Sequence, residues 1–293
     1  MQIRTNSLKA WVLAARPKTL TGAASPVMIG AAVAADEGFK VLPFILCMLF
    51  AFAMQIDANF INDYFDYKKG TDREDRLGPE RACAQGWVTP RAMKGAIAIT
   101  TLVSCLIGLP LAFIGGLPLI TVGLACVVFC FLYTTSLSYL GLGDLLVLVF
   151  FGIIPVGFTY YLQTGHWSVE VTLAGMACGF VTDCLLIINN YRDREQDAIS
   201  GKKTLIVRYG KKFGLHSYLW CGIIATLLAI CAMISAEGKA PTPLIAIYLP
   251  LHISAYCKMR RLEGRMLNSV LGITAGNIFL FAVLLSIQFL FFR

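Results

Sequence analysis

Hydrophobic residues in this sequence form long runs that charged residues rarely interrupt. No charged residue occurs between Gly95 and Gly143. A bilayer core about 30 Å thick needs roughly 20 helical residues, so this stretch is long enough for two membrane spans. The sequence GGLP at Gly115–Pro118 predicts the turn between them. The pattern therefore predicts an all-α, polytopic membrane protein.

The uncharged runs along the whole chain, measured against the same length, predict nine spans and leave no room for a soluble domain. We therefore expect residues 1–293 to form a single integral membrane domain. The sequence AARPKT, with Pro17 at a helix start, predicts a break within the first span. The predicted spans are Ala10–Ala34, Val41–Ile61, Ala92–Ile114, Leu117–Tyr133, Asp144–Gln163, Val169–Asn190, Leu215–Ser235, Thr242–Cys257 and Asn268–Phe292.

Composition supports a membrane protein, and the distribution of charged residues predicts its orientation in the membrane. Hydrophobic residues make up 57% of the chain and charged residues 14%, which excludes an ordinary soluble domain. The lysines and arginines cluster in 4–18, 68–94, 192–212 and 258–265, all on one predicted side, whereas Lys40, Lys239 and Arg293 fall on the other. The positive-inside rule predicts a multi-pass protein of the cell's inner (cytoplasmic) membrane, with the N-terminus cytoplasmic and the C-terminus outside. The net charge of +8 then indicates topology and contact with anionic membrane lipid, not nucleic-acid binding.

Polar residues form a stripe at the end of the second predicted span. At about 100° per residue, its members fall within an arc of roughly 100° on a helix. These residues are Gln55, Asn59, Asn62, Asp63 and Asp66. Asp57 points nearly the opposite way and has no assigned role. The roles of Asp144 and Asp183, which lie within or beside later spans, are also left open.

The sixth predicted span ends in a second stripe of the same kind. Asn189, Asn190, Asp193 and Asp197 again share an arc of about 100°. By the charge count both stripes end on the same side of the membrane. Each is followed by cations: Lys68, Lys69, Arg73, Arg76 and Arg81 after the first, and Lys202, Lys203, Arg208, Lys211 and Lys212 after the second.

Carboxylates that begin inside an apolar span need a compensating partner, because an intramembrane charge costs about 2.5 to 3.5 kcal/mol on insertion scales. A solvated loop with carboxylates that balance the basic residues is the plain alternative. Oxygen ligands without Cys or His suit Mg²⁺, which is commonly bound by one or two carboxylates together with substrate phosphates. Two facing stripes followed by cations therefore predict that Mg²⁺ connects the carboxylates to a diphosphate. The predicted substrate has this diphosphate as its head and a tail that lies in lipid.

Several motifs of this chain resemble the UbiA superfamily of intramembrane prenyltransferases. The similarity rests on RPKT at Arg16, on NFINDYFDYKKGTDREDRLGPERA from Asn59, on GLGDLLVLVFFG from Gly141 and on NNYRDREQDAISGKKTLIVRYG from Asn189. The resemblance implies nine helices around a central cavity, with two aspartate blocks that face each other. It implies catalytic and metal-binding roles for Asp63, Asp66, Asp193 and Asp197. Together with the stripes and cations, it predicts substrate binding by Arg16, Asn59, Asn62, Lys68, Arg76, Arg81, Tyr133, Asn189, Asn190 and Lys202.

The segments DRLGPERA and GKKTLIVR favour the branch of the superfamily that prenylates a naphthoate. The resemblance then implies Mg²⁺-dependent transfer from polyprenyl diphosphate to 1,4-dihydroxy-2-naphthoate, with loss of carboxylate to give demethylmenaquinol. A sister prenyltransferase acting on 4-hydroxybenzoate, or making haem or lipid precursors, would share the same metal ligands. A transporter of divalent cations or organic anions is the alternative from another class. The connector from Tyr133 to Asp144 has no cation, although related enzymes often place a basic residue there.

Overall fold

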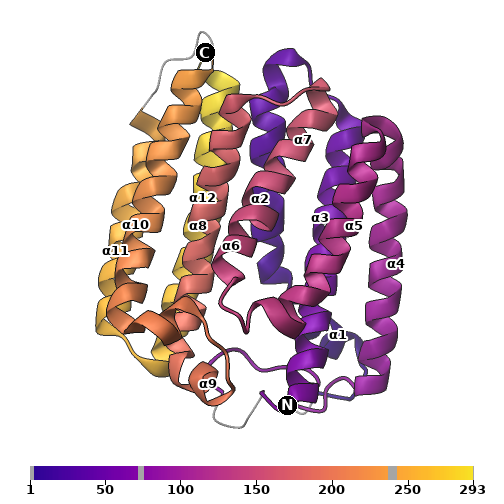
Figure 1. Ribbon diagram of the computed structural model, residues 1–293, viewed down its shortest axis with the longest axis vertical. Coiled ribbons are helices and arrows are strands. Elements are labelled where there is room, and N and C mark those ends of the chain that lie inside the picture. Colours follow the sequence, from indigo (N-terminus) through magenta and orange to yellow (C-terminus); the bar gives the residue numbers. More distant parts are fainter. Residues whose placement is uncertain (1–2, 72–75, 237–242, 293) are drawn as a thin grey trace.

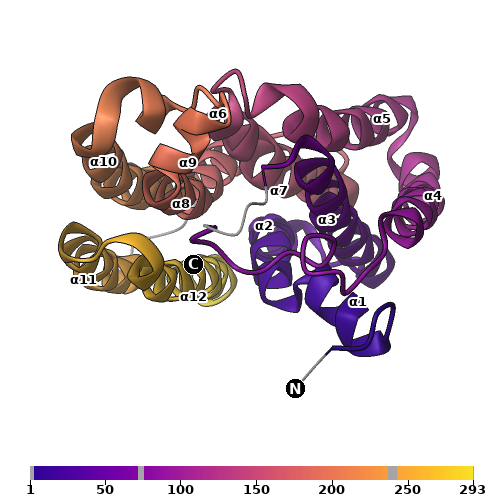
Figure 2. The same cartoon turned by 90° about the horizontal axis from the view of Figure 1, so that it is seen from below.

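The computed structural model describes residues 3–71, 76–236 and 243–292, and the described residues form helices that stand side by side (Figure 1). No strand occurs within these ranges. Seen from below, α8, α10, α11 and α12 lie on one side and α2 to α5 on the other (Figure 2). The helices are α1 (Leu8–Ala15), α2 (Leu20–Val33), α3 (Val41–Lys69), α4 (Pro90–Gly115), α5 (Leu117–Leu132), α6 (Gly143–Leu148), α7 (Ile154–Thr164), α8 (Val169–Arg192), α9 (Arg194–Ile199), α10 (Leu205–Ser235), α11 (Tyr248–Arg261) and α12 (Leu267–Phe291).

Seven helical segments in the described part of the chain are long and apolar enough to cross a membrane. They correspond to α3, α4, α5 with its following π-turn, α6 joined to α7 through a second π-turn, α8, α10 and α12 with the 3-10 turn before it. The other two of the nine predicted spans correspond to α2 and α11, which have 14 residues each as α-helices. Short 3-10 turns extend both of them. The all-α, multi-pass membrane fold predicted from the sequence is confirmed.

The first predicted span does not run unbroken from Ala10. Arg16 adopts a left-handed conformation, with φ 52° and ψ 65°, and ends α1. The chain restarts with Pro17 in a 3-10 turn before α2. Proline disfavours helical geometry at the preceding residue and has no N–H to donate, so the break falls where the sequence predicts it. The break places the Arg16 side chain at the end of the bundle where α3 ends.

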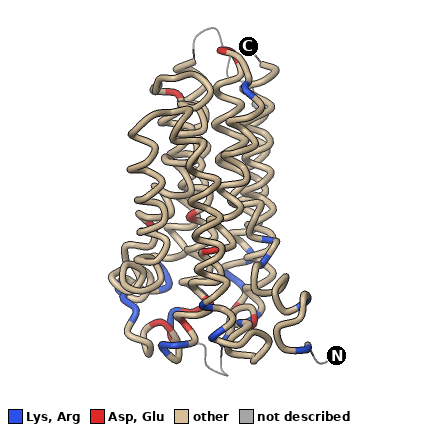
Figure 3. Tube along the Cα trace, turned by 90° about the vertical axis from the view of Figure 1, so that its right-hand side faces the viewer, with Lys and Arg blue, Asp and Glu red and all other residues tan. Residues whose placement is uncertain are grey.

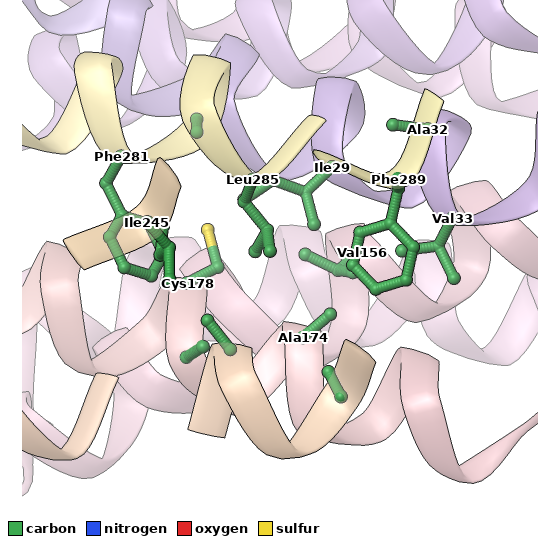
Figure 4. Close-up of a cluster of buried hydrophobic side chains, with 14 of the residues drawn as sticks. Ile29, Ala32, Val33, Val156, Ala174, Cys178, Ile245, Phe281, Leu285 and Phe289 are labelled. Carbon is green, nitrogen blue, oxygen red and sulfur yellow. The ribbon is translucent and has the colours of Figure 1, made fainter. Parts of the chain in front are cut away.

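A large cluster of buried apolar side chains occupies the part of the bundle away from that end. Ile29 and Val33 of α2 meet Val156 of α7, Cys178 of α8 and Leu285 of α12 in one cluster of buried side chains (Figure 4). Because these side chains fill the space between the helices, the two sides of the bundle are held together there. The opposite end of the bundle, where α3 and α8 terminate, contains the polar residues of the two stripes together with smaller apolar clusters.

Glycines allow α8 to approach the π-turn between α6 and α7. A Cβ atom on Gly152 would lie 2.4 Å from the Gly175 carbonyl oxygen and 2.6 Å from the Gly179 Cα. Small residues permit such close helix contacts in membranes. Gly152→Ala is therefore expected to lower the thermal unfolding temperature of the detergent-solubilised protein. Gly123→Ala in α5 is the matched control, since nothing lies within 4 Å of its Cβ position; an equal loss in both variants would contradict the packing argument.

Lysines and arginines gather at the end of the bundle where the N-terminus lies (Figure 3). The ends of α3, α8 and α11 and the segments that follow them contribute most of these cations. Lys40, at the start of α3, lies at the opposite end. Lys239 and Arg293, which the charge argument also placed there, lie outside the described residues. The clustering of the described cations at one end agrees with the predicted grouping of basic segments.

Candidate active site

A cavity of about 530 Å³ opens at the basic end of the bundle. Residues from α3, α6, α8, α9 and α12, from the π-turn Tyr133–Leu137 after α5 and from other connecting segments form its wall. The two aspartate blocks, 130 residues apart between Asp63 and Asp193, thus meet around one space, as the stripes predict. The sequence-predicted residues that line the cavity are Arg16, Asn62, Asp66, Arg76, Arg81, Tyr133, Asn189, Asn190, Asp193, Asp197 and Lys202.

Asp66 of α3 and Asp197 of α9 each lie beside a cation in the cavity wall. Asp66 Oδ2 lies 3.5 Å from Arg81 Nη2, and Asp197 Oδ1 lies 3.5 Å from Lys202 Nζ. Both aspartates are more than nine-tenths buried. Lys202 interacts electrostatically with both carboxylates, so it connects the two blocks.

Burial and charge act against each other at Asp197 and Lys202. Burial raises the pKa of Asp197 to about 6, while the Lys202 ammonium opposes this rise. Burial alone would lower the pKa of Lys202, but the Asp197 and Asp66 carboxylates outweigh it, so the pKa is raised. A further cation in the cavity would favour the ionised form of Asp197.

Asp193 is held in place by a chain of hydrogen bonds. Arg192 Nε donates to Asp193 Oδ1 over 2.7 Å, and Arg192 Nη2 donates to Oδ2 over 2.6 Å. The same guanidinium donates through Nη1 to Asn268 Oδ1 over 2.7 Å, and Asn268 Nδ2 donates to the Leu77 carbonyl over 2.9 Å. This chain joins the end of α8 to α12 and to the segment after α3. Arg192 was not singled out from the sequence, although its place beside Asp193 was a signal.

Three predicted site residues do not line the cavity: Asn59, Asp63 and Lys68. Asp63 is fully buried, and its two oxygens accept from the backbone N–H groups of Ala82 and Cys83 over 2.9 and 2.8 Å. Arg16 Nη2 lies 3.7 Å from Asp63 Oδ2. Asn59 Nδ2 donates to Ala15 O and Thr19 Oγ1, each over 2.9 Å, whereas Lys68 is exposed. Asp63 and Asn59 thus attach neighbouring segments to α3, and this geometry favours a positioning role for both.

Asp63→Ala is expected to destabilise the protein, because it removes the acceptor for two buried N–H groups. Each such group left without a partner costs about 1–3 kcal/mol. Asp63→Asn retains one acceptor oxygen and should be affected less. Thermal unfolding in detergent measures both variants. A stability equal to that of the unchanged protein, combined with lost activity, would instead favour a direct catalytic role for Asp63.

Lys69 supplies the cation that the connector after Tyr133 lacks. Its Nζ donates to the carbonyls of Thr134 and Thr135 over 3.2 and 2.7 Å, and it lies 3.8 Å from the centre of the Tyr139 ring. Lys69 also lines the cavity. Sequence reasoning counted Lys69 among the cations after the first stripe but did not connect it with the Tyr133–Asp144 connector, because it comes from the end of α3.

The cavity residues fit Mg²⁺ that is shared with a phosphate ligand. Within the described ranges, no three His, Cys, Asp or Glu side chains come together closely enough to form a metal site by themselves. The cavity nevertheless holds Asp66, Asp193 and Asp197, together with Gln196, whose Oε1 is buried without a hydrogen-bond partner among the described residues. Mg²⁺ keeps several waters and binds through one or two carboxylates plus substrate phosphates, so this donor set is sufficient.

Comparisons with known proteins agree with this geometry. The model of the UbiA prenyltransferase family matches residues 23–271. A 1,4-dihydroxy-2-naphthoate octaprenyltransferase of Haemophilus influenzae is 35% identical over 280 residues, which cover 88% of this chain and 89% of that protein. The Escherichia coli protein described by the same words is 37% identical over 235 residues, 76% of this chain and 75% of that one. A solved UbiA homolog from Archaeoglobus fulgidus, bound to GPP and Mg²⁺, shares the fold with a TM-score of 0.62 at 14% identity, covering 94% of this chain and 99% of its own.

Proposed function

Because this chain belongs to the UbiA prenyltransferase family and is a multi-pass membrane prenyltransferase, we propose that it prenylates 1,4-dihydroxy-2-naphthoate. The donor is a polyprenyl diphosphate, the reaction requires Mg²⁺, and loss of the carboxylate gives demethylmenaquinol. The observation that carries this proposal is the meeting of both aspartate blocks and their cations around one cavity. Family membership makes the chain an enzyme, so the transporter alternative is set aside.

The cavity wall binds the diphosphate of the donor. Arg16, Arg76 and Arg81 from one side and Lys69 and Lys202 from the other present positive charge to it. Guanidinium groups form bidentate hydrogen bonds with phosphate oxygens, and the ammonium groups act as point charges. As the allylic C–O bond breaks, these cations stabilise the negative charge that develops on the leaving diphosphate.

Asp66, Asp193 and Asp197 would hold Mg²⁺ beside the same diphosphate. When bound there, Mg²⁺ supplies Lewis-acid stabilisation of the leaving group. Asn62, Asn189 and Asn190 also line the cavity and would provide further oxygen ligands. Lys202 and Arg81, which also line the cavity, lie beside the Asp197 and Asp66 carboxylates and hold them in position.

The acceptor is assigned from the relatives. Two relatives, at 35% and 37% identity, are described as 1,4-dihydroxy-2-naphthoate octaprenyltransferases. They support a naphthoate as the acceptor, in place of the 4-hydroxybenzoate that a sister enzyme would use. The polyprenyl tail would extend into the apolar part of the bundle, and water excluded by that surface could not trap the reacting carbon. The basic end would face the cytoplasm in the inner membrane, because that arrangement satisfies the positive-inside rule.

Product analysis tests this function. The purified protein is incubated with Mg²⁺, a polyprenyl diphosphate and either 1,4-dihydroxy-2-naphthoate or 4-hydroxybenzoate, and the products are identified by mass spectrometry. We expect a prenylated naphthol that has lost carbon dioxide, and no prenylated benzoate. Prenylation of the benzoate alone would overturn the acceptor assignment, and no product with either would overturn the proposed function.

A further inference from the structure

Asp144 lies in the cavity wall, and nothing in the donor chemistry above uses it. It occupies the first turn of α6. Within the described residues, its carboxylate has no ion pair and no hydrogen bond with another side chain. In this respect it differs from Asp66, Asp193 and Asp197, each of which has a cation within 3.5 Å.

Tyr133 lies close to Asp144 in the cavity wall. A Cβ atom on Gly143 would lie 3.9 Å from both Cε2 and Oη of Tyr133, so the phenol ring lies against the start of α6. The Tyr133 hydroxyl interacts electrostatically with Asp144 most strongly, then with Asp183, Asp66 and Asp197. Tyr133 and Asp144 therefore lie next to each other in the cavity wall.

The other neighbours of Asp144 provide no cation. Asp183 of α8 is buried and interacts electrostatically with Asp144, and its Oδ1 has no hydrogen-bond partner among the described residues. Cys221 of α10 approaches the other Asp183 oxygen at 3.9 Å. The π-turn at Val149–Ile153, which also packs on α6, contains no titratable side chain. Among the described residues Asp144 and Asp183 therefore have no cation partner, whereas Asp66, Asp193 and Asp197 each lie beside one.

We propose that Asp144 is a catalytic residue that takes the hydroxyl proton of the aromatic acceptor. The inference rests on the proposed prenyl transfer and adds the group that activates the acceptor ring. A phenol attacks carbon far better as its proton is withdrawn, and general base catalysis of this kind contributes typically 10²–10⁴-fold. A carboxylate without a cation partner suits this role, because a bound cation lowers its basicity.

The proposed step balances without an added reactant. Asp144 takes the proton of the hydroxyl next to the carboxylate-bearing ring carbon, and that carbon bonds to the allylic carbon of the donor. The donor C–O bond breaks, and its electron pair leaves with the diphosphate. The carboxylate then departs as carbon dioxide, its bonding electrons restore the aromatic ring, and Asp144 returns the proton to the oxygen. Because no net proton is gained or lost, a single carboxylate can serve both stages.

A structural role for Asp144 predicts different behaviour. An acidic residue in the first turn stabilises a helix through its dipole by about 0.3–1 kcal/mol. Glu170 holds the equivalent position in α8, at the other end of the bundle. Glu170→Gln therefore measures the loss of a first-turn charge alone, and it is expected to leave both kcat and acceptor binding unchanged.

Steady-state kinetics and equilibrium binding on Asp144→Asn test the proposal. We expect kcat to fall about 100-fold, with KM for polyprenyl diphosphate unchanged. Binding of 1,4-dihydroxy-2-naphthoate without donor should weaken, while binding of inorganic diphosphate with Mg²⁺ stays the same. Asp144→Glu should recover most of the lost kcat, because it restores a carboxylate. If Asp144→Asn does not fold, Asp144→Ser takes its place in the same measurements.

Two results would overturn the role of Asp144: an unchanged kcat, or an equal loss of acceptor and diphosphate binding. Failure of the proposed function is distinguishable, because it shows in the products of the unchanged protein. If that protein prenylates only 4-hydroxybenzoate, the naphthoate is wrong. The same 100-fold fall in Asp144→Asn on the benzoate hydroxyl would then still support proton transfer to Asp144.

Discussion

Asp66→Asn is expected to lower kcat about 1000-fold while the protein remains folded in the membrane. Asp66 is buried in the cavity wall. Its carboxylate forms an ion pair with the Arg81 guanidinium and interacts electrostatically with the Lys202 ammonium. Loss of one preorganised group that stabilises transition-state charge typically costs 10²–10³-fold, and here the variant also removes a proposed Mg²⁺ ligand. Single-turnover measurement of prenyl transfer, with membrane content quantified in parallel, measures the effect.

Asp57→Asn is the matched control on the same helix. Asp57 is also fully buried in α3, but it accepts hydrogen bonds from Thr100 and Thr101 of α4 and does not line the cavity. Its replacement should reduce thermal stability, because part of a buried hydrogen-bond network is lost, and should leave kcat near that of the unchanged protein. Similar kinetics for the Asp57 and Asp66 variants would contradict the assignment of Asp66 to the site.

Removal of divalent cations is expected to reduce prenyl transfer to background. Without Mg²⁺, the three cavity carboxylates would face the diphosphate of the donor without the charge that bridges them. Excess chelator followed by Mg²⁺ should abolish and then restore turnover. Ca²⁺ should restore turnover poorly, since its bonds to oxygen ligands are longer and its coordination geometry is less regular than that of Mg²⁺.

Chelation should leave the fold intact, which separates the proposed site from a structural metal site. The described residues contain no metal site built from protein ligands alone, so folding gains little from the ion. We expect the thermal unfolding temperature without substrate to be the same with and without chelator. Full turnover in excess chelator would contradict the metal-dependent mechanism.

The fold was predictable because its signal is local. The length of an uncharged run predicts how many residues the helix has for crossing the membrane. Pro17 predicts the break after Arg16, because proline disfavours helical geometry at the preceding residue. The lengths of α2 and α11 were less accessible, because 3-10 turns extend both helices and the sequence pattern does not distinguish these turns from α-helix. Helix periodicity also placed Asp66, Asp193 and Asp197 on the faces that meet at the cavity.

Periodicity could not separate Asp63 from Asp66. Both lie within one arc of α3, yet Ala82 and Cys83 cover Asp63, and only Asp66 reaches the cavity. The position of that covering segment depends on contacts far apart in the sequence, such as the bond from Asn268 to Leu77. The same limit explains why Arg192 was not singled out and why the contact of Lys69 with the Tyr133–Asp144 connector was not predicted, because the partners of both residues lie on other segments.

Binding of Mn²⁺ in place of Mg²⁺ tests the central claim most directly, namely that the two aspartate blocks jointly bind a metal–diphosphate unit. Free Mn²⁺ is measured by electron paramagnetic resonance during titration of the purified protein, with and without inorganic diphosphate. We predict tight binding only when diphosphate is present, weakened at least about 10-fold by either Asp66→Asn or Asp197→Asn and unchanged by Asp57→Asn. Mn²⁺ binding that is independent of diphosphate, or that persists in both cavity variants, would contradict the account.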